Sequence, residues 1–365
     1  MREYVLVLLV AALTTFLVTP WAEKWAVRIG AVAEVRGRDI HTQRTPRLGG
    51  IAMYAGLLAG LLLASQLPMM KAVFANGEIV RALLSAASIL LVLGIIDDRW
   101  GLDAPTKLAG QVLAGSLLAL QGITLIWLPA FDRVIVLDPW TSVLLTVLLL
   151  VITVNAINFV DGVDGLAAGI AAIGAMAFFV YSYFLSVEYG FVRATLPTLV
   201  SVLLVGVAVG FLPANFSKAR SFMGDTGAML LGLLLAVATI ALTGQVDAAA
   251  LASTTFFPAF MPILLPLAVL AVPLIDLASA VARRVRAKRN PFSADQGHLH
   301  HQLLARGHSQ TRTVLVLYGL TATLAFGAVA TAFAPVGWVL LAVVICLAIL
   351  AWFGFAAPRK LAVRL

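Results

Sequence analysis

Long apolar runs separated by short polar segments make up most of the chain. We count eleven such runs, each near the length of about 20 residues that a helix needs to cross a bilayer. They cover residues 3–19, 48–66, 79–96, 105–121, 141–157, 166–186, 194–212, 226–243, 256–282, 313–332 and 335–355. The pattern predicts an all-α, polytopic integral membrane protein with about 11 transmembrane helices. We expect a single transmembrane domain over residues 1–365, whose first run is a retained helix because no convincing cleavage site follows it.

Composition agrees with this class of protein. Hydrophobic residues make up 62% of the chain and charged residues only 12%, with a mean hydropathy of +1.02. Soluble domains are about half apolar and a quarter charged. The one cysteine, Cys346, allows no internal disulfide and no cysteine-based metal site. The net charge of +8 raises the possibility of nucleic acid binding, but the distribution of that charge points to the membrane instead.

The basic residues favour one side of the membrane. When the loops between the eleven runs are assigned alternately to two sides, 20 of the 25 Lys and Arg residues fall on one side. Basic residues concentrate in cytoplasmic loops, so we expect the N-terminus outside, the C-terminus in the cytoplasm and the protein in the cell membrane. The cytoplasmic side then holds all five histidines and most of the candidate chemistry, in the segments 20–47, 97–107, 155–165, 213–225 and 283–312.

Three acidic and amide-containing segments stand at the cytoplasmic ends of the predicted spans. Asp97 and Asp98 are adjacent, and adjacent carboxylates repel each other unless a cation or a proton lies between them. Such a pair is a candidate metal partner or a coupled acid and base, while a solvated helix end is the simpler alternative. In 213–225, Asn215 precedes Asp225, which lies in a Gly-Asp-Thr-Gly turn and could be a cation ligand or only a helix N-cap.

The stretch "NAINFVDGVDGLAAG" carries four polar side chains at a spacing of three. They are Asn155, Asn158, Asp161 and Asp164. Residues three apart are neighbours on a helix, so the last three predict a drifting polar stripe, with polar caps around a loop as the alternative. Ionisable groups near lipid usually have a function, which favours a binding site.

The segment 283–312 combines basic residues with a group of histidines. Most of the arginines between 283 and 289 suit a positive-inside anchor. His298, His300 and His301 form "HLHH", which lacks the spacing of a zinc-binding H-E-x-x-H motif. Imidazoles beside arginines suit the binding of an anion. Carboxylates favour a hard cation, Mg²⁺ or Mn²⁺, so the combination suggests phosphoryl transfer involving a lipid phosphate.

The motifs together resemble the polyprenyl-phosphate N-acetylhexosamine-1-phosphate transferase family, which includes the phospho-MurNAc-pentapeptide translocases. The resemblance rests on "TPRLGGIAM", "DDRWGLDAPTKLAGQ", "NAINFVDGVDGLAAG", "PANFSKARSFMGDTGA" and "DQGHLHHQLL". The translocases usually have three consecutive histidines, so "HLHH" looks like the branch that initiates wall teichoic acid, O-antigen or related glycans. That branch uses UDP-N-acetylglucosamine (UDP-GlcNAc) and undecaprenyl phosphate, and the family often forms dimers.

The resemblance also implies roles for the individual residues. Asp97, with Asp98 beside it, would deprotonate or orient the lipid phosphate, and Asp225 would bind Mg²⁺. Asn158 and Asp161 would join Asp225 at the metal, near the diphosphate. Substrate binding would fall to Lys107, Asn155, Asp164, Asn215, His298, His300, His301 and Arg284. The expected reaction is attack of a lipid-phosphate oxygen on UDP-GlcNAc with release of UMP, and a covalent aspartyl-phosphate route is the mechanistic rival.

Two other classes of membrane protein fit this sequence less well. A proton-coupled transporter would place its acidic residues near mid-span, whereas here they gather at one edge. An intramembrane aspartyl protease would leave the basic, histidine-rich segment without a use. Both are therefore disfavoured relative to the transferase.

Overall fold

A computed structural model describes residues 1–33, 45–75, 77–129, 134–188, 195–245, 256–286 and 299–355. The predicted helical class is confirmed. The α-helices are α1 (Arg2–Ile29), α2 (Gly49–Ala64), α3 (Lys71–Phe74), α4 (Glu78–Trp100), α5 (Ala104–Leu120), α6 (Pro139–Val160), α7 (Leu166–Glu188), α8 (Thr195–Asn215), α9 (Gly224–Gln245), α11 (Phe256–Arg286), α12 (Leu299–Ala305), α13 (Gln310–Ala330) and α14 (Val336–Phe355). A short 3₁₀ helix, η1 (Pro68–Met70), precedes α3, and strands β1 (Trp127–Pro129) and β2 (Val134–Val136) form an antiparallel pair in which Leu128 opposes Ile135.

Each of the eleven apolar runs corresponds to one long helix. Within the described residues, eight helices are long and apolar enough to cross a membrane, and a ninth is counted if α2 and the η1–α3 segment, bent by 98°, form one span. Of the other two runs, α5 has 17 residues and α11 contains the shorter apolar stretch Ile263–Asp276. The multi-pass architecture is thus confirmed, and the count of eleven spans stays a prediction.

The helices extend further than the apolar runs that predicted them. The first run ends at residue 19, but α1 continues through Pro20 and several charged residues to Ile29, where Gly30 ends it in a left-handed conformation. Similarly, α4 reaches Trp100 and α5 begins at Ala104, so the expected loop 97–107 shortens to three residues. A helix can continue into the polar interface because its backbone hydrogen bonds are satisfied internally. Asp97 and Asp98 therefore lie on a helix.

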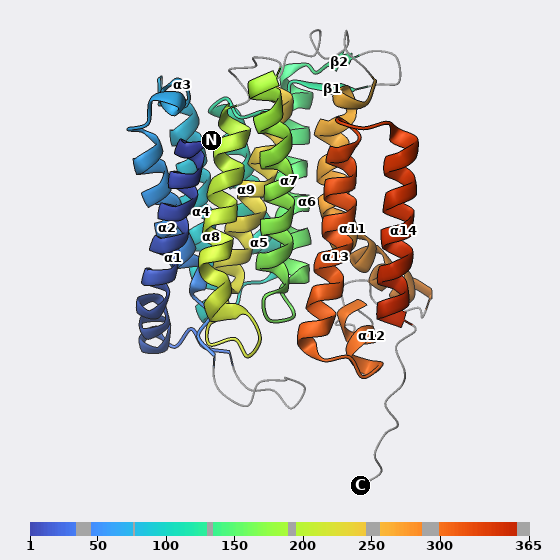
Figure 1. Ribbon diagram of the computed structural model, residues 1–365. Coiled ribbons are helices and arrows are strands. Elements are labelled where there is room, and N and C mark those ends of the chain that lie inside the picture. Colours follow the sequence, from blue (N-terminus) through green and yellow to red (C-terminus); the bar gives the residue numbers. More distant parts are fainter. Residues whose placement is uncertain are drawn as a thin grey trace.

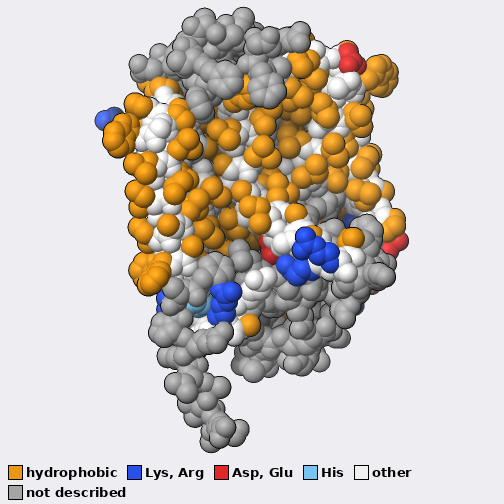
Figure 2. Space-filling view, turned by 90° about the vertical axis from the view of Figure 1, so that its right-hand side faces the viewer, with side chains coloured by type: hydrophobic (Ala, Val, Ile, Leu, Met, Phe, Trp, Pro, Cys, Tyr) orange, Lys and Arg blue, Asp and Glu red, His pale blue; other side chains and the backbone are white. Residues whose placement is uncertain are grey.

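The bundle is built around α9. The apolar, membrane-spanning part of α9 is completely buried inside the protein, whereas only 6% of the corresponding part of α14 is buried. Helices α2, α4, α6, α7 and α8 pack against α9, and α13 and α14 stand at one edge of the bundle (Figure 1). A broad apolar surface covers the middle of the face seen in Figure 2, and most Lys and Arg side chains visible there lie toward its lower end. This is the surface expected of a protein surrounded by lipid.

Small residues bring α2 and α4 close to the start of α9. A Cβ on Gly50 would overlap the backbone of Gly227, and a Cβ on Gly94 would overlap that of Thr226. The segment before α2 adds backbone hydrogen bonds, including one from the amide of Phe222 to the carbonyl of Pro46 at 2.8 Å. Close packing against backbone leaves little freedom for the first turn of α9, which carries Asp225.

Candidate active site

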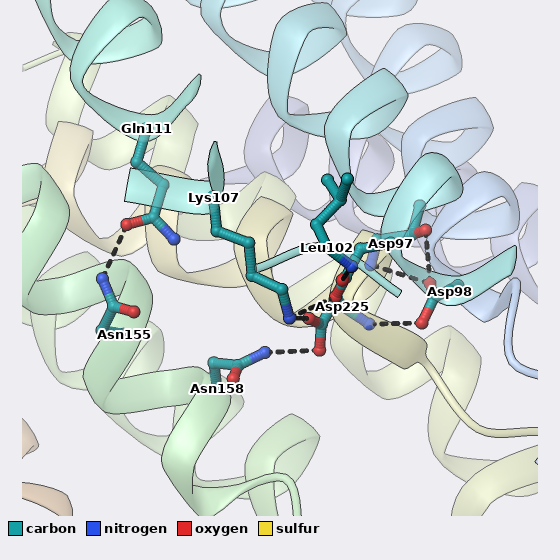
Figure 3. A network of polar contacts seen from close by, with 9 residues as sticks. Asp97, Asp98, Leu102, Lys107, Gln111, Asn155, Asn158 and Asp225 are labelled. Carbon is teal, nitrogen blue, oxygen red and sulfur yellow. Dashed lines mark hydrogen bonds and ion pairs between the residues drawn. The ribbon is translucent and has the colours of Figure 1, made fainter. Parts of the chain in front are cut away.

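Asp225, in the first turn of α9, lies at the centre of a polar cluster (Figure 3). Its Oδ2 accepts a hydrogen bond of 2.6 Å from Lys107 Nζ on α5, and its Oδ1 accepts one of 2.7 Å from Asn158 Nδ2 on α6. The ammonium group of Lys107 also pairs with Asp97 on α4. Four helices thus contribute to one cluster, and the positive charge of Lys107 holds two carboxylates together that would otherwise repel each other.

Asp97 is held from a second direction. Its Oδ1 accepts a hydrogen bond of 2.6 Å from the backbone amide of Leu102, in the short loop after α4. Gly101 ends α4 with a positive φ of 73°, which turns the chain back toward Asp97. Both carboxylate oxygens of Asp97 therefore have partners, and its side chain is fixed beside Lys107.

Asp98 caps the N-terminus of α9 from a neighbouring helix. Its Oδ1 accepts a hydrogen bond of 2.9 Å from the amide of Asp225, and its Oδ2 accepts from the amide and the hydroxyl of Thr226 at 3.1 and 2.6 Å. The first amide groups of a helix have no partner within the helix, and the helix dipole favours a negative charge there. The N-cap alternative considered for Asp225 thus applies to Asp98, and Asp225 is left free to face the cluster.

A second pair of side chains, Asn155 and Gln111, lies beside the cluster on the same two helices as Asn158 and Lys107. Asn155 lies one turn before Asn158 on α6, and it donates hydrogen bonds to Gln111 Oε1 at 2.7 Å and to the carbonyl of Val151 at 2.8 Å. Gln111 lies one turn after Lys107 on α5 and is buried. The Gln111–Asn155 bond therefore fixes the spacing of the two helices that supply Lys107 and Asn158 (Figure 3).

The polar stripe predicted for Asn158, Asp161 and Asp164 is not continuous on a helix, and that expectation was wrong. Helix α6 ends at Val160, Asp161 is its C-cap and Asp164 lies in the loop before α7. Gly165, at a φ of 76°, accommodates the turn that separates the two helices. The expected loop 155–165 is accordingly reduced to residues 161–165.

The two acids of this loop have different surroundings. Burial, together with the negative charges of Asp225 and Asp98, raises the pKa of Asp161 to about 8. Asp164 is buried, and its Oδ2 accepts a hydrogen bond of 2.9 Å from the amide of Ala219 in the loop between α8 and α9. Asp161 is thus electrostatically part of the Asp225 cluster, whereas Asp164 ties two loops together.

Asn215 uses both ends of its side-chain amide on backbone groups. Its Oδ1 accepts from the amide of Gly165 at 2.9 Å, and its Nδ2 donates to the carbonyl of Ser221 at 2.9 Å. Asn215 therefore braces the loop that follows α6. A direct contact of Asn215 with substrate stays a prediction.

The basic and histidine-rich segment is only partly described. His298 lies outside the described residues, and the side chains of His300 and His301, in α12, are outside them as well. Arg284 is buried near the end of α11. Helix α12 lies at the same end of the molecule as the loop between α6 and α7 (Figure 1). The anion-binding roles of these four residues stay predictions.

The donor set suits a magnesium ion that is shared with a substrate. Among the described residues there is no group of three or more His, Cys, Asp or Glu side chains placed to hold a metal ion. Mg²⁺ is usually bound through one or two carboxylates plus substrate phosphates and water. Asp225, whose Oδ1 also accepts from Asn158, is a carboxylate that a site of this kind could use, and the binding of Mg²⁺ there stays a prediction.

Three residues of this region were missed by the sequence analysis. Thr226 follows Asp225 directly, and Gln111 lies four residues after Lys107, which is the spacing of neighbours on one helix face. Both could have been found from the quoted motifs. Tyr318 on α13 donates a hydrogen bond to the carbonyl of Gly165, and nothing in its own sequence surroundings indicates that contact.

Comparison with known proteins identifies the family of the chain. Residues 80–243 match the family model described as Glycosyl transferase family 4, a range that includes Asp97, Asp98, Lys107 and Asp225. The decaprenyl-phosphate N-acetylglucosaminephosphotransferase of Mycolicibacterium smegmatis is 44% identical over 337 residues, which cover 91% of this chain and 83% of the relative.

More distant relatives have related names. The probable undecaprenyl-phosphate N-acetylglucosaminyl 1-phosphate transferase of Bacillus subtilis is 31% identical, with 87% of this chain and 82% of the relative covered. The phospho-N-acetylmuramoyl-pentapeptide-transferase of Mycobacterium leprae is 29% identical, with 88% of this chain and 94% of the relative covered. The family expected from the motifs is confirmed, and the chain belongs to glycosyl transferase family 4, with polyprenyl-phosphate N-acetylglucosamine-1-phosphate transferases among its homologues.

Proposed function

We propose that this protein transfers N-acetylglucosamine 1-phosphate from UDP-GlcNAc to a polyprenyl phosphate, in a Mg²⁺-dependent reaction that releases UMP. The observation that carries the proposal is the Asp97–Lys107–Asp225 arrangement, in which one ammonium group joins two carboxylates at the end of the bundle. A cluster of this kind can receive a metal-bound diphosphate and a lipid phosphate side by side. The names of the relatives support the sugar and the acceptor class.

The length of the acceptor is a separate part of the proposal. Undecaprenyl phosphate was expected from the motifs, but the mycobacterial relatives at 44–45% identity are named for decaprenyl phosphate. The Bacillus subtilis relative, at 31% identity, is named for undecaprenyl phosphate. We therefore favour decaprenyl phosphate and keep undecaprenyl phosphate as the alternative.

In this proposal, different side chains act on the two substrates. Asp97 orients the lipid phosphate and accepts its remaining proton. An oxygen of that phosphate attacks the β-phosphorus of UDP-GlcNAc, and the bond from this phosphorus to the bridging oxygen breaks, so that UMP leaves with that oxygen. Lys107 offsets the negative charge that spreads over the transferring phosphoryl group, while Asn158 orients Asp225. Mg²⁺, when bound at Asp225, would neutralise charge on the diphosphate.

The same proposal places the reaction on the cytoplasmic face of the cell membrane. The excess of Lys and Arg lies in the loops on the side of the Asp225 cluster, and cytoplasmic loops carry that excess. Nucleotide sugars are available in the cytoplasm. The apolar belt of the protein lies in the bilayer, so an acceptor lipid in the same bilayer can bring its phosphate to the Asp225 cluster. The product would begin a cell-envelope glycan.

The test is UMP release by the purified protein in detergent with UDP-GlcNAc, Mg²⁺ and either decaprenyl or undecaprenyl phosphate. Asp225→Asn should abolish turnover, because it removes a charge from the metal site and leaves Lys107 with one carboxylate partner. Asp138→Asn is the matched control: Asp138 caps α6 at its other end, and Asn caps a helix equally well.

Three results would count against parts of the proposal. Near wild-type turnover in Asp225→Asn would remove Asp225 from the metal site. Preference for UDP-MurNAc-pentapeptide in a competition assay would replace the sugar. A phosphoenzyme formed with UMP release in the absence of lipid would replace direct attack by the covalent route.

A further inference from the structure

The loop that follows α6 is held at Gly165 by two distant elements. Gly165 donates its amide hydrogen to Asn215 Oδ1, at the end of α8, at 2.9 Å. Its carbonyl accepts a hydrogen bond from the hydroxyl of Tyr318 on α13. The two contacts thus pair both the backbone amide and the backbone carbonyl of Gly165, which lies immediately after Asp164. Together they fix the path of the backbone at the end of the acidic loop.

A second glycine, Gly169, leaves the space that the ring of Tyr318 occupies. A Cβ on Gly169, one turn into α7, would fall within the ring of Tyr318. A Cβ on Gly165 would lie 3.4 Å from the Tyr318 hydroxyl and 2.8 Å from the ring of Phe216. The aromatic ring can therefore rest against the start of α7 only because these positions have no side chain.

A third contact ties the same loop to the segment before α9. Ala219 donates its amide to Asp164 at 2.9 Å, from a turn in which Ser217 and Lys218 have φ values of 47° and 70°. Left-handed conformations are uncommon for residues other than glycine, and this turn places the Ala219 amide against Asp164. The acidic loop is consequently anchored to α8, to the α8–α9 loop and to α13.

We propose that Tyr318 is a positioning residue for the nucleotide sugar. It acts through the Gly165 carbonyl to hold the segment 161–165, which follows directly on the last turn of α6, where Asn158 donates a hydrogen bond to Asp225. Tyr318 itself does not touch the reacting atoms. The inference rests on the proposed function, in which Asp225 serves the diphosphate of UDP-GlcNAc. Because the segment 161–165 follows the α6 turn whose Asn158 bonds to Asp225, we assign it to the UDP-GlcNAc side of the reaction.

The direct test is Tyr318→Phe, which keeps the ring against Gly169 and removes only the hydroxyl. Loss of one hydrogen bond should raise the KM for UDP-GlcNAc, and weaken UDP-GlcNAc binding in titration calorimetry, by roughly three- to tenfold. The kcat and the KM for polyprenyl phosphate should stay within about twofold of wild type. Tyr54→Phe is the matched control: its hydroxyl bonds to Ser88 at 2.7 Å, between α2 and α4, and both KM values should be unchanged.

A second variant tests the geometry while the hydroxyl is kept. Gly169→Ala places a methyl group where the Tyr318 ring lies, so it should displace the ring and raise the KM for UDP-GlcNAc at least as much as Tyr318→Phe. In the double variant the two effects should not add, because both break the same contact. Thermal unfolding in detergent shows whether each variant is folded.

The outcomes separate the two proposals. An unchanged KM and affinity for UDP-GlcNAc in a folded Tyr318→Phe would overturn the positioning role. Equal increases in the KM of both substrates, or full additivity in the double variant, would also overturn it. Failure of the wild-type protein to release UMP with either polyprenyl phosphate would instead count against the proposed function.

Discussion

Substitution of Asp98 can show whether its carboxylate orients Asp225 or takes part in proton transfer. Its carboxylate accepts three hydrogen bonds from the first turn of α9, two from Thr226 and one from the amide of Asp225. Asp98→Asn keeps the shape of the side chain but leaves one acceptor oxygen and introduces a donor. If the oxygen keeps the two bonds to Thr226, the new NH₂ group meets the amide of Asp225 donor to donor.

The cost follows from these contacts. A hydrogen bond to a charged group contributes about 1.5–3 kcal/mol, and a charge at a helix N-terminus about 0.3–1 kcal/mol. Removing one such bond and the charge therefore costs about 2–4 kcal/mol in the fixed geometry of Asp225. If the transition state needs that geometry, kcat/KM falls roughly 30- to 1000-fold, because about 1.4 kcal/mol corresponds to a factor of ten.

The assay is initial-rate UMP release as a function of pH, with Asp98→Asn and Thr226→Val compared. Thr226→Val removes only the hydroxyl donor and leaves both backbone bonds and the charge of Asp98. Its loss should therefore be that of one hydrogen bond to a charged group, about 1.5–3 kcal/mol, or roughly 10- to 160-fold in kcat/KM. The residual activity of Asp98→Asn should keep the pH profile of the wild type, because a capping carboxylate takes no proton during turnover.

Three results would refute the reasoning. They are a kcat/KM for Asp98→Asn within about threefold of wild type, a larger loss in Thr226→Val than in Asp98→Asn, and the disappearance of one limb of the pH profile. The last result would return Asp98 to the acid–base role expected from the sequence.

Three further predictions use the same assay or thermal unfolding. Lys107→Met should reduce kcat/KM by about 100-fold or more, because Asp97 and Asp225 then repel each other; activity within about tenfold of wild type would contradict this. Gly94→Ala should lower the free energy of unfolding by about 1–3 kcal/mol, since its methyl group overlaps the backbone of Thr226, and an unchanged melting temperature would refute the close approach. Chelation of divalent cations should stop UMP release reversibly, with activity restored by added Mg²⁺ or Mn²⁺; turnover that continues in excess chelator would exclude the metal.

The helices could be predicted from the sequence because their signal is local. An apolar run of the right length needs no knowledge of its neighbours to be recognised, and all eleven runs correspond to helices. The ends of the helices were predicted less accurately. The helix α1 continues to Ile29 although the apolar run stops at residue 19, because a helix does not have to end where lipid ends.

Several residues predicted for the site contact one another in the structure, but the geometry of those contacts could not be predicted. Lys107 and Asp225 are 118 positions apart, and no local pattern shows that they form an ion pair. The period of three in "NAINFVDGVDGLAAG" suggested one helical stripe, yet α6 ends at Val160, and Gly165 turns the chain at a φ of 76° before α7 begins. Tyr318 gave no signal at all, because its importance comes entirely from the glycines that it meets in the folded protein.

The enclosed position of α9 has a consequence for how the chain is made. The helices that surround it most closely, α2, α4, α6, α7 and α8, are all synthesised before it. When α9 enters the bilayer during translation, most of its final surroundings are thus already present, and it can move from the translocon into a slot lined by protein. Helices α11, α13 and α14 follow and close the bundle from one edge, so the cluster around Asp225 can assemble while the last third of the chain is still on the ribosome.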